Sequence, residues 1–196
     1  MPGLGNWNAR WIRPKTTGPV LFAKTAYLSK LLNQYGYADK FLMNTESAVL
    51  CGSTGDEPIC AQDDWMKTKT YQLVQTFTVA ATYGLRANVW YSLGGWRGSG
   101  LIDTYGQPAS PYQAFLFNNQ MLQRATPWGQ VDLYQNVKGY AFQRNGKLLW
   151  ILWSLDGVDH TIPLGTLPSS IYTVLGERID PTENITITLS PVYIEW

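Results

Sequence analysis

The first part of the chain alternates between helical and strand-like patterns of hydrophobic residues. Before residue 19 no period is visible, and the sequence reads as a loop. Apolar residues then recur at helical spacing over 19–35, 63–84 and 110–125. Two short apolar runs, at 41–46 and 86–93, lie between these predicted helices and indicate strands, the first of them buried. Strands that alternate with helices in this way pair in parallel, so we predict βα repeats.

Beyond Pro127 the helical period disappears, and only strands and turns are predicted. The pair Asn145-Gly146 indicates a two-residue hairpin between strands at 140–144 and 147–153. The run 149–153 is apolar on both faces, which is typical of a central strand covered on each side. Asp156-Gly157 predicts a turn into the next strand. The remaining strands are expected at 158–162, 171–175, 186–189 and 192–195. This pattern predicts an antiparallel β module.

Charge and composition exclude several classes of function. Lys and Arg number 15 and Asp and Glu 14, so the net charge of +1 disfavours a nucleic-acid partner. No apolar run approaches the roughly 20 residues of a membrane span, and the N-terminal sequence lacks the features of a signal peptide. With one His and two Cys, we expect no metal site. Carboxylate chemistry therefore remains the main possibility.

Glu46 is the main candidate for chemistry. Strand alternation places Leu42, Asn44 and Glu46 on one face, with Glu46 last. In βα arrays the catalytic groups lie at the carboxyl ends of strands. Glu46 is therefore either a nucleophile or general base, or a solvated strand-end residue. On the next strand Trp90 offers either a stacking surface for a sugar or core packing; the chain is rich in such rings, with nine Trp and twelve Tyr.

Two short motifs in this order resemble a known enzyme family. Asn44-Thr45-Glu46 closes one strand, and Val89-Trp90-Tyr91-Ser92 closes the next. Together they resemble the seventh and eighth βα units of retaining clan-A glycoside hydrolases, which are TIM-barrel enzymes. The segment 188–196 is similar to the end of the C-terminal β-sandwich that many of these enzymes carry. The resemblance implies an α/β plus all-β chain, with a partial (β/α) barrel in 1–127 and an antiparallel β-sandwich in 128–196.

The resemblance also implies roles for individual residues. Glu46 matches the nucleophile, and Trp90 matches the aromatic wall beneath the reacting sugar. Asn44 belongs to the same motif as a substrate-binding residue, and Trp96 lies in the loop that lines a neighbouring subsite. The substrate implied is an oligosaccharide or polysaccharide, and no cofactor is expected because two carboxyl groups suffice for glycosidic cleavage.

The family's acid/base Glu has no counterpart in this sequence. We therefore expect the chain to be the C-terminal part of a longer glycosidase, inactive by itself, whose partner is the missing barrel portion or a second copy of the chain. Loop carboxylates at Glu57, Asp63 and Asp103 are weak substitutes, because hydrated loops do not raise a pKa.

Three further points stay open at the level of sequence. Cys51 and Cys60 either form a disulfide over the Glu46 loop, as expected if the parent enzyme is secreted, or are two reduced cysteines. A noncatalytic carbohydrate-binding protein is an alternative, with Tyr140, Trp150 and Trp153 as candidate contacts, although a central strand favours their burial. A structural module that stabilises a partner chain is a third possibility.

Overall fold

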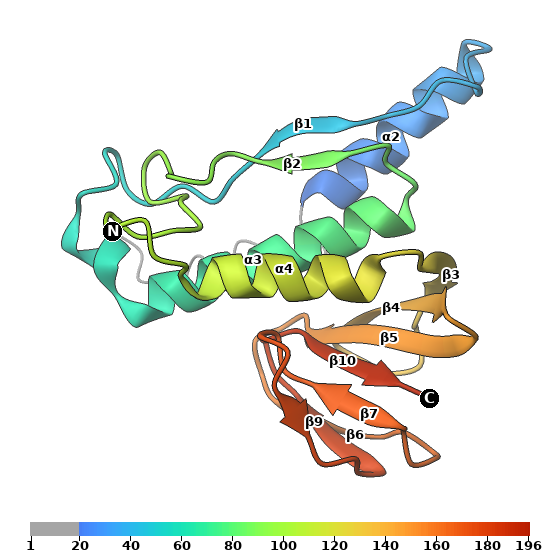
Figure 1. Ribbon diagram of the computed structural model, residues 1–196. Coiled ribbons are helices and arrows are strands. Elements are labelled where there is room, and N and C mark those ends of the chain that lie inside the picture. Colours follow the sequence, from blue (N-terminus) through green and yellow to red (C-terminus); the bar gives the residue numbers. More distant parts are fainter. Residues whose placement is uncertain (1–19) are drawn as a thin grey trace.

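The computed structural model describes residues 20–196, and the predicted loop before residue 19 lies outside this range. The elements form layers (Figure 1). A short parallel strand pair lies on one side of two long helices, and an antiparallel sheet lies on the other. Among the described residues, none of the helices is long and apolar enough to cross a bilayer.

The helical part matches the expected order of elements. The helices, the 3₁₀ turn and the two strands are α2 (Val20–Gln34), β1 (Asn44–Ser47), η1 (Pro58–Ala61), α3 (Asp63–Thr82), β2 (Asn88–Trp90) and α4 (Ser110–Leu122). Two acidic residues in the first turn of α3 complement its helix dipole, and the N-cap residue is Gln62. The N-cap residue of α4 is Ala109.

Both parallel strands are shorter than predicted, and the first is not buried. Residues 41–43 lie outside β1, and Phe41 is 68% exposed. β2 covers three residues of the expected 86–93. Each strand has only the other as a neighbour within residues 20–196, so the pairing extends only from Asn44–Asn88 to Ser47–Trp90. The apolar runs that predicted longer buried strands are consequently left partly in solvent.

The second half is a six-stranded antiparallel sheet in the order β3-β4-β5-β10-β7-β8, faced by the pair β6-β9. The strands are β3 (Thr126–Gln130), β4 (Val137–Arg144), β5 (Lys147–Ser154), β6 (His160–Pro163), β7 (Ser170–Tyr172), β8 (Arg178–Ile179), β9 (Asn184–Ile187) and β10 (Val192–Glu195). The β4–β5 hairpin is confirmed: Asn145 and Gly146 have φ of 50° and 78°, as a two-residue turn requires.

The turn at Asp156-Gly157 leads into the next strand as predicted, with Gly157 at φ 76°. That strand, β6, leaves the sheet and pairs with β9. This move lets Ile162 cover the apolar face of the larger sheet. β3 and β8 were not predicted; the Pro and Gly of β3 argue against a strand, but β3 is an edge strand, where Pro is tolerated.

The central strand β5 is covered on both sides, as predicted. Its residues Leu149, Ile151 and Trp153 join an apolar cluster shared with α3 and α4. Leu152 joins a second cluster closed by β6 and β9. Tyr140 and Trp153 are each 1% exposed, so these two candidate sugar contacts are core residues. Trp150 is half-buried and packs against Trp196, with ring centroids 4.4 Å apart.

A buried hydrogen bond links α4 to β10. The Tyr193 hydroxyl donates to the Asn118 Oδ1 at 2.9 Å, and both side chains are fully buried. Tyr193→Phe removes this donor and leaves the Asn118 carbonyl unpaired, so we expect a loss of about 1–3 kcal/mol in the free energy of unfolding. Urea denaturation measures this loss. The control is Tyr105→Phe, at an 87% exposed position, and equal stability of the two variants would contradict the prediction.

Candidate active site

The parallel pair β1–β2 carries an irregularity at the candidate nucleophile. Asn44 lies opposite Asn88, but the next matched pair is Ser47 with Trp90, so β1 has one extra residue between the two rungs. Thr45 and Glu46 are both exposed within this stretch. A bulge of this kind redirects side chains, and bulges are common beside active sites. Glu46 is therefore in solvent near the carboxyl end of β1, and strict alternation with Asn44 fails.

Polar side chains fasten the two strands together around Glu46. The Asn44 Nδ2 donates to the Asn88 Oδ1 at 2.7 Å, and the Ser47 hydroxyl donates to the Val89 carbonyl at 2.9 Å. The Tyr91 amide donates to the Ser47 carbonyl at 2.8 Å. Within residues 20–196, no side chain forms a hydrogen bond or ion pair with the Glu46 carboxylate. Its strand is therefore held, while the carboxylate itself is free to meet a ligand.

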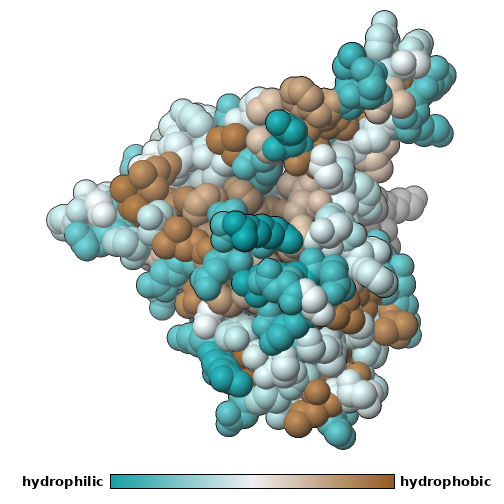
Figure 2. Space-filling view, turned by 45° about the vertical axis from the view of Figure 1, so that its right-hand side comes forward, coloured by the Kyte–Doolittle hydropathy of each residue, from teal (hydrophilic) through white to brown (hydrophobic). Residues whose placement is uncertain are grey.

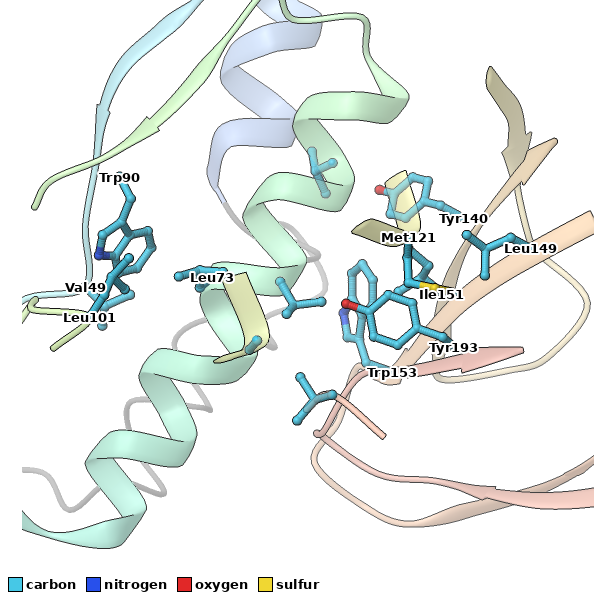
Figure 3. Packing of buried hydrophobic residues seen from close by; sticks show 14 of the residues in the cluster. Val49, Leu73, Trp90, Leu101, Met121, Tyr140, Leu149, Ile151, Trp153 and Tyr193 are labelled. Carbon is cyan, nitrogen blue, oxygen red and sulfur yellow. The ribbon is translucent and has the colours of Figure 1, made fainter. Parts of the chain in front are cut away.

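Trp90 does not share the exposed face of Glu46. Its side chain is 9% exposed, and its indole N–H donates to the Ser99 carbonyl at 2.9 Å. Figure 3 shows Trp90 beside Val49 and Leu101, on the side of the strands that faces Leu73 of α3. The ring supports the strand ends from beneath and offers little surface to a sugar.

Tyr91 is the aromatic residue that sequence reasoning missed. It is the next residue after Trp90, and its side chain is 43% exposed. Val89 of β2 is also exposed, and Tyr91 follows the strand directly. The sequence carries no signal that separates Tyr91 from Trp90, because the burial of Trp90 depends on the side of the strands on which α3 packs.

The loop after β1 is held closed by a disulfide bond and by the carboxylate of Glu57. Cys51 and Cys60 are joined in a disulfide. Inside the loop, the Glu57 carboxylate accepts hydrogen bonds from the backbone N–H groups of Ser53, Thr54 and Gly55. These donors lower the pKa of Glu57 to about 2. A carboxyl group that stays ionised is a poor proton donor near neutral pH, so Glu57 is a loop anchor and does not suit the role of a general acid.

The other two loop carboxylates are no better placed. Asp103 accepts hydrogen bonds from the backbone N–H groups of Tyr105 and Gln107, each at 2.8 Å, and so holds its own turn. Asp63 lies in the first turn of α3, where a negative charge complements the helix dipole. Within residues 20–196, no group of three or more His, Cys, Asp or Glu could hold a metal ion.

Glu57 makes the loop sensitive to acid. The folded pKa of Glu57 lies below its ordinary value of 4.5, so its stabilising effect is complete above about pH 4.5 and is lost as the pH falls toward about 2. We expect the amides of Ser53 and Gly55 to lose protection in this window. Amide NMR during an acid titration measures this loss of protection. Glu57→Gln, compared with Glu183→Gln on an exposed loop of the β half, should open the loop at pH 6; unchanged amides in Glu57→Gln would contradict this account.

The loop after β2 carries Trp96, which is 53% exposed. The Trp96 backbone N–H donates to the Ser99 hydroxyl at 3.0 Å, and the Arg97 guanidinium lies 5.4 Å from the centre of the Trp96 ring. The structure therefore presents a solvated carboxylate near a strand end and two exposed aromatic rings, Tyr91 and Trp96, in the segment that follows β2. Exposed aromatic faces are suited to stacking on sugar rings, and a carboxylate is suited to attack at an anomeric carbon.

Sequence comparison assigns no family to the chain. No model of a known protein family matches it, and no curated protein sequence matches it.

Comparison of folds points to glycoside hydrolases. A family 39 glycoside hydrolase from Bacteroides cellulosilyticus WH2 aligns with a TM-score of 0.63 and 17% identity over 87% of this chain and 37% of its own. A GH30 endoxylanase from Clostridium papyrosolvens C71 aligns with a TM-score of 0.53 and 13% identity, over 85% of this chain and 44% of its own. A conserved exported protein from Bacteroides fragilis aligns with a TM-score of 0.67 and 11% identity, over 94% of this chain and 44% of its own. The chain thus spans well under half of these proteins, and at such identities the likeness concerns the fold, which is glycosidase-like.

Proposed function

We propose that the chain is the C-terminal part of a retaining glycosidase, with Glu46 as its nucleophile. The observation that carries the proposal is the exposed Glu46 carboxylate near the carboxyl end of a parallel strand, within a glycosidase-like fold. In this account β1 and β2 are the seventh and eighth strands of a (β/α) barrel within residues 1–127. Residues 128–196 form the β-sandwich that follows it.

The open strand pair supports a barrel completed by further polypeptide. Parallel sheets occur almost only where both faces are covered, yet β1 and β2 have no other strand beside them within residues 20–196. Exposed apolar side chains surround the pair, namely Phe41, Met43, Val89, Tyr91 and Leu93. Figure 2 shows hydrophobic side chains across the upper half of the molecule, at the height of β1 and β2 in Figure 1. Six additional βα units would cover this surface, either in a longer chain or in a second one.

The polypeptide that supplies the six additional βα units would also supply the missing acid/base residue. Retaining hydrolysis needs two carboxyl groups about 5–5.5 Å apart, one to attack the anomeric carbon and one to protonate the leaving oxygen. Glu57 and Asp103 are bound to backbone N–H groups of their own loops, so neither suits the second role. Glu46 would form the glycosyl-enzyme bond, and the acid/base residue would then deprotonate the water that breaks it.

The surrounding residues have distinct proposed roles. Tyr91 and Trp96 present aromatic faces to the sugar rings of an oligosaccharide or polysaccharide. The Asn44 Nδ2 holds β1 against β2 by its hydrogen bond to Asn88. The side-chain carbonyl oxygen of Asn44 is then left for a sugar hydroxyl. Trp90 supports the site from below rather than as a wall of it. The disulfide between Cys51 and Cys60 favours an oxidising compartment, so we propose that the parent enzyme is secreted.

Turnover of aryl glycosides tests the proposal. The chain is assayed alone and again together with a polypeptide that supplies six further βα units, fused in front of it or added as a second chain. We expect turnover only in the assembled barrel. Turnover by the chain alone would place the acid/base residue within it and overturn the account of a partial barrel. A folded, assembled barrel with no activity on any aryl glycoside would overturn the proposed glycosidase function.

A further inference from the structure

Lys69 is a buried cation without a carboxylate partner. It lies on α3 and is 3% exposed. Its ammonium donates to the carbonyl of Gly98 at 2.9 Å and to the carbonyl of Gly100 at 2.6 Å. No carboxylate in the described part of the chain forms an ion pair with it. Burial lowers the pKa of Lys69 to about 8. A charge buried against neutral carbonyls costs stability, so stability alone does not explain this residue.

Lys69 belongs to a set of three side chains that hold one loop. The Trp65 indole N–H also donates to the Gly98 carbonyl, at 3.2 Å, and the Trp90 indole N–H donates to the Ser99 carbonyl at 2.9 Å. Three consecutive carbonyls, those of residues 98–100, are thus bound by donors from α3 and β2. The backbone of Arg97 and Gly98 has positive φ, 49° and 72°, in this turn.

The held segment connects directly to the exposed Trp96. Ser99 is fully buried, and its hydroxyl accepts the backbone N–H of Trp96 at 3.0 Å. The Arg97 carbonyl accepts the Cys51 N–H at 2.8 Å, and the Arg97 guanidinium donates to the Gly52 carbonyl. The loop 94–100 is therefore fixed to α3 on one side and to the disulfide loop on the other, while the Trp96 ring remains in solvent.

We propose that Lys69 is a positioning residue for Trp96: it holds the loop 94–100 so that the exposed indole is fixed at the end of the strand pair that carries Glu46. A fixed aromatic ring binds a sugar without the entropy cost of being ordered on binding. The role of this ring in sugar binding rests on the proposed function, but the positioning itself does not.

The experiment compares Lys69→Met with Lys67→Met by NMR on the chain. Lys67 lies on the same helix in an exposed pair with Asp64, so its replacement controls for loss of a lysine. Spectra of the ¹⁵N-labelled indoles report all nine Trp side chains, and Trp96→Phe identifies the Trp96 signal. In Lys69→Met we expect the Trp96 signal to shift and the amides of 94–100 to become mobile, with the remaining amides unchanged. In Lys67→Met the Trp96 signal should stay in place.

A second variant keeps the test informative if Lys69→Met does not fold. Ser99→Ala removes the acceptor of the Trp96 N–H and leaves Lys69 in place. It should mobilise Trp96 while the amides of Gly98 and Gly100 stay ordered. A Trp96 signal that is unchanged in Ser99→Ala, or in a folded Lys69→Met, would overturn the proposal.

Oligosaccharide binding by the assembled barrel separates this proposal from the proposed function. We expect Lys69→Met to weaken oligosaccharide binding by about tenfold and to raise KM more than it lowers kcat. The substitution would misplace Trp96, which contacts the sugar, and would leave the reacting groups in place. A mobile Trp96 in a protein that binds no oligosaccharide would support the positioning and contradict the glycosidase function. Tight oligosaccharide binding by Lys69→Met, with an unchanged Trp96 signal, would contradict the positioning role and support the glycosidase function.

Discussion

Replacing Glu46 with Gln in the assembled barrel is expected to lower kcat/KM for aryl glycosides by about 10⁴-fold or more. Gln has nearly the same shape as Glu but cannot attack an anomeric carbon, so the glycosyl-enzyme bond does not form. The side chain is exposed and forms no hydrogen bond with residues 20–196, so the substitution should leave the fold intact. Initial rates with a series of aryl glycosides measure the loss.

The matched control for Glu46→Gln is Glu183→Gln, which removes the same charge at an exposed position of the β half. Its kcat/KM should equal that of the unsubstituted protein. A loss of less than about tenfold in Glu46→Gln would be too small for the absence of a nucleophile, and would assign Glu46 to the solvated surface.

Trp153→Ala is expected to lower the free energy of unfolding by about 3–5 kcal/mol, the usual cost of deleting a large buried ring. Trp153 is 1% exposed and lies in the cluster that joins β4, β5 and β10 to α3 and α4. Because helices and sheet share this cluster, we expect both to lose stability together. Circular dichroism for the helices and Trp fluorescence for the core should follow one common transition.

Trp128→Ala is the control for this prediction, since it deletes the same side chain where it is 72% exposed. Its cost should stay within about 0.5 kcal/mol, as for other exposed positions. Two separate transitions in Trp153→Ala, with the helical signal unaffected, would show that the helical part is stable without the sheet.

Local signals in the sequence predicted most of the elements, because they act over few residues. The helical period predicted α2, α3 and α4, and Asn145-Gly146 predicted the hairpin through its backbone requirement. The position of Glu46 near the end of a strand followed in the same way. Such features depend on residues that are near each other along the chain.

Features that depend on distant contacts could not be predicted. The bulge in β1 arises from its pairing with β2, so alternation alone assigned Glu46 to the face of Asn44. The burial of Trp90 against α3 follows from the side of the strands on which the helix packs, and this made Tyr91 the exposed ring. Lys69 has no signal in the sequence either, because its partners are backbone carbonyls about 30 residues away.

Covalent trapping of the nucleophile tests the central claim most directly. An assembled barrel is incubated with a 2-deoxy-2-fluoro glycoside, which forms the glycosyl-enzyme bond and releases it slowly, and the protein is then digested with trypsin. Residues 41–67 form one tryptic peptide that contains both Glu46 and Glu57, so fragmentation must locate the added sugar. The account predicts a glycosyl adduct on Glu46. An adduct on another carboxylate, or none in an enzyme that turns over aryl glycosides, would contradict it.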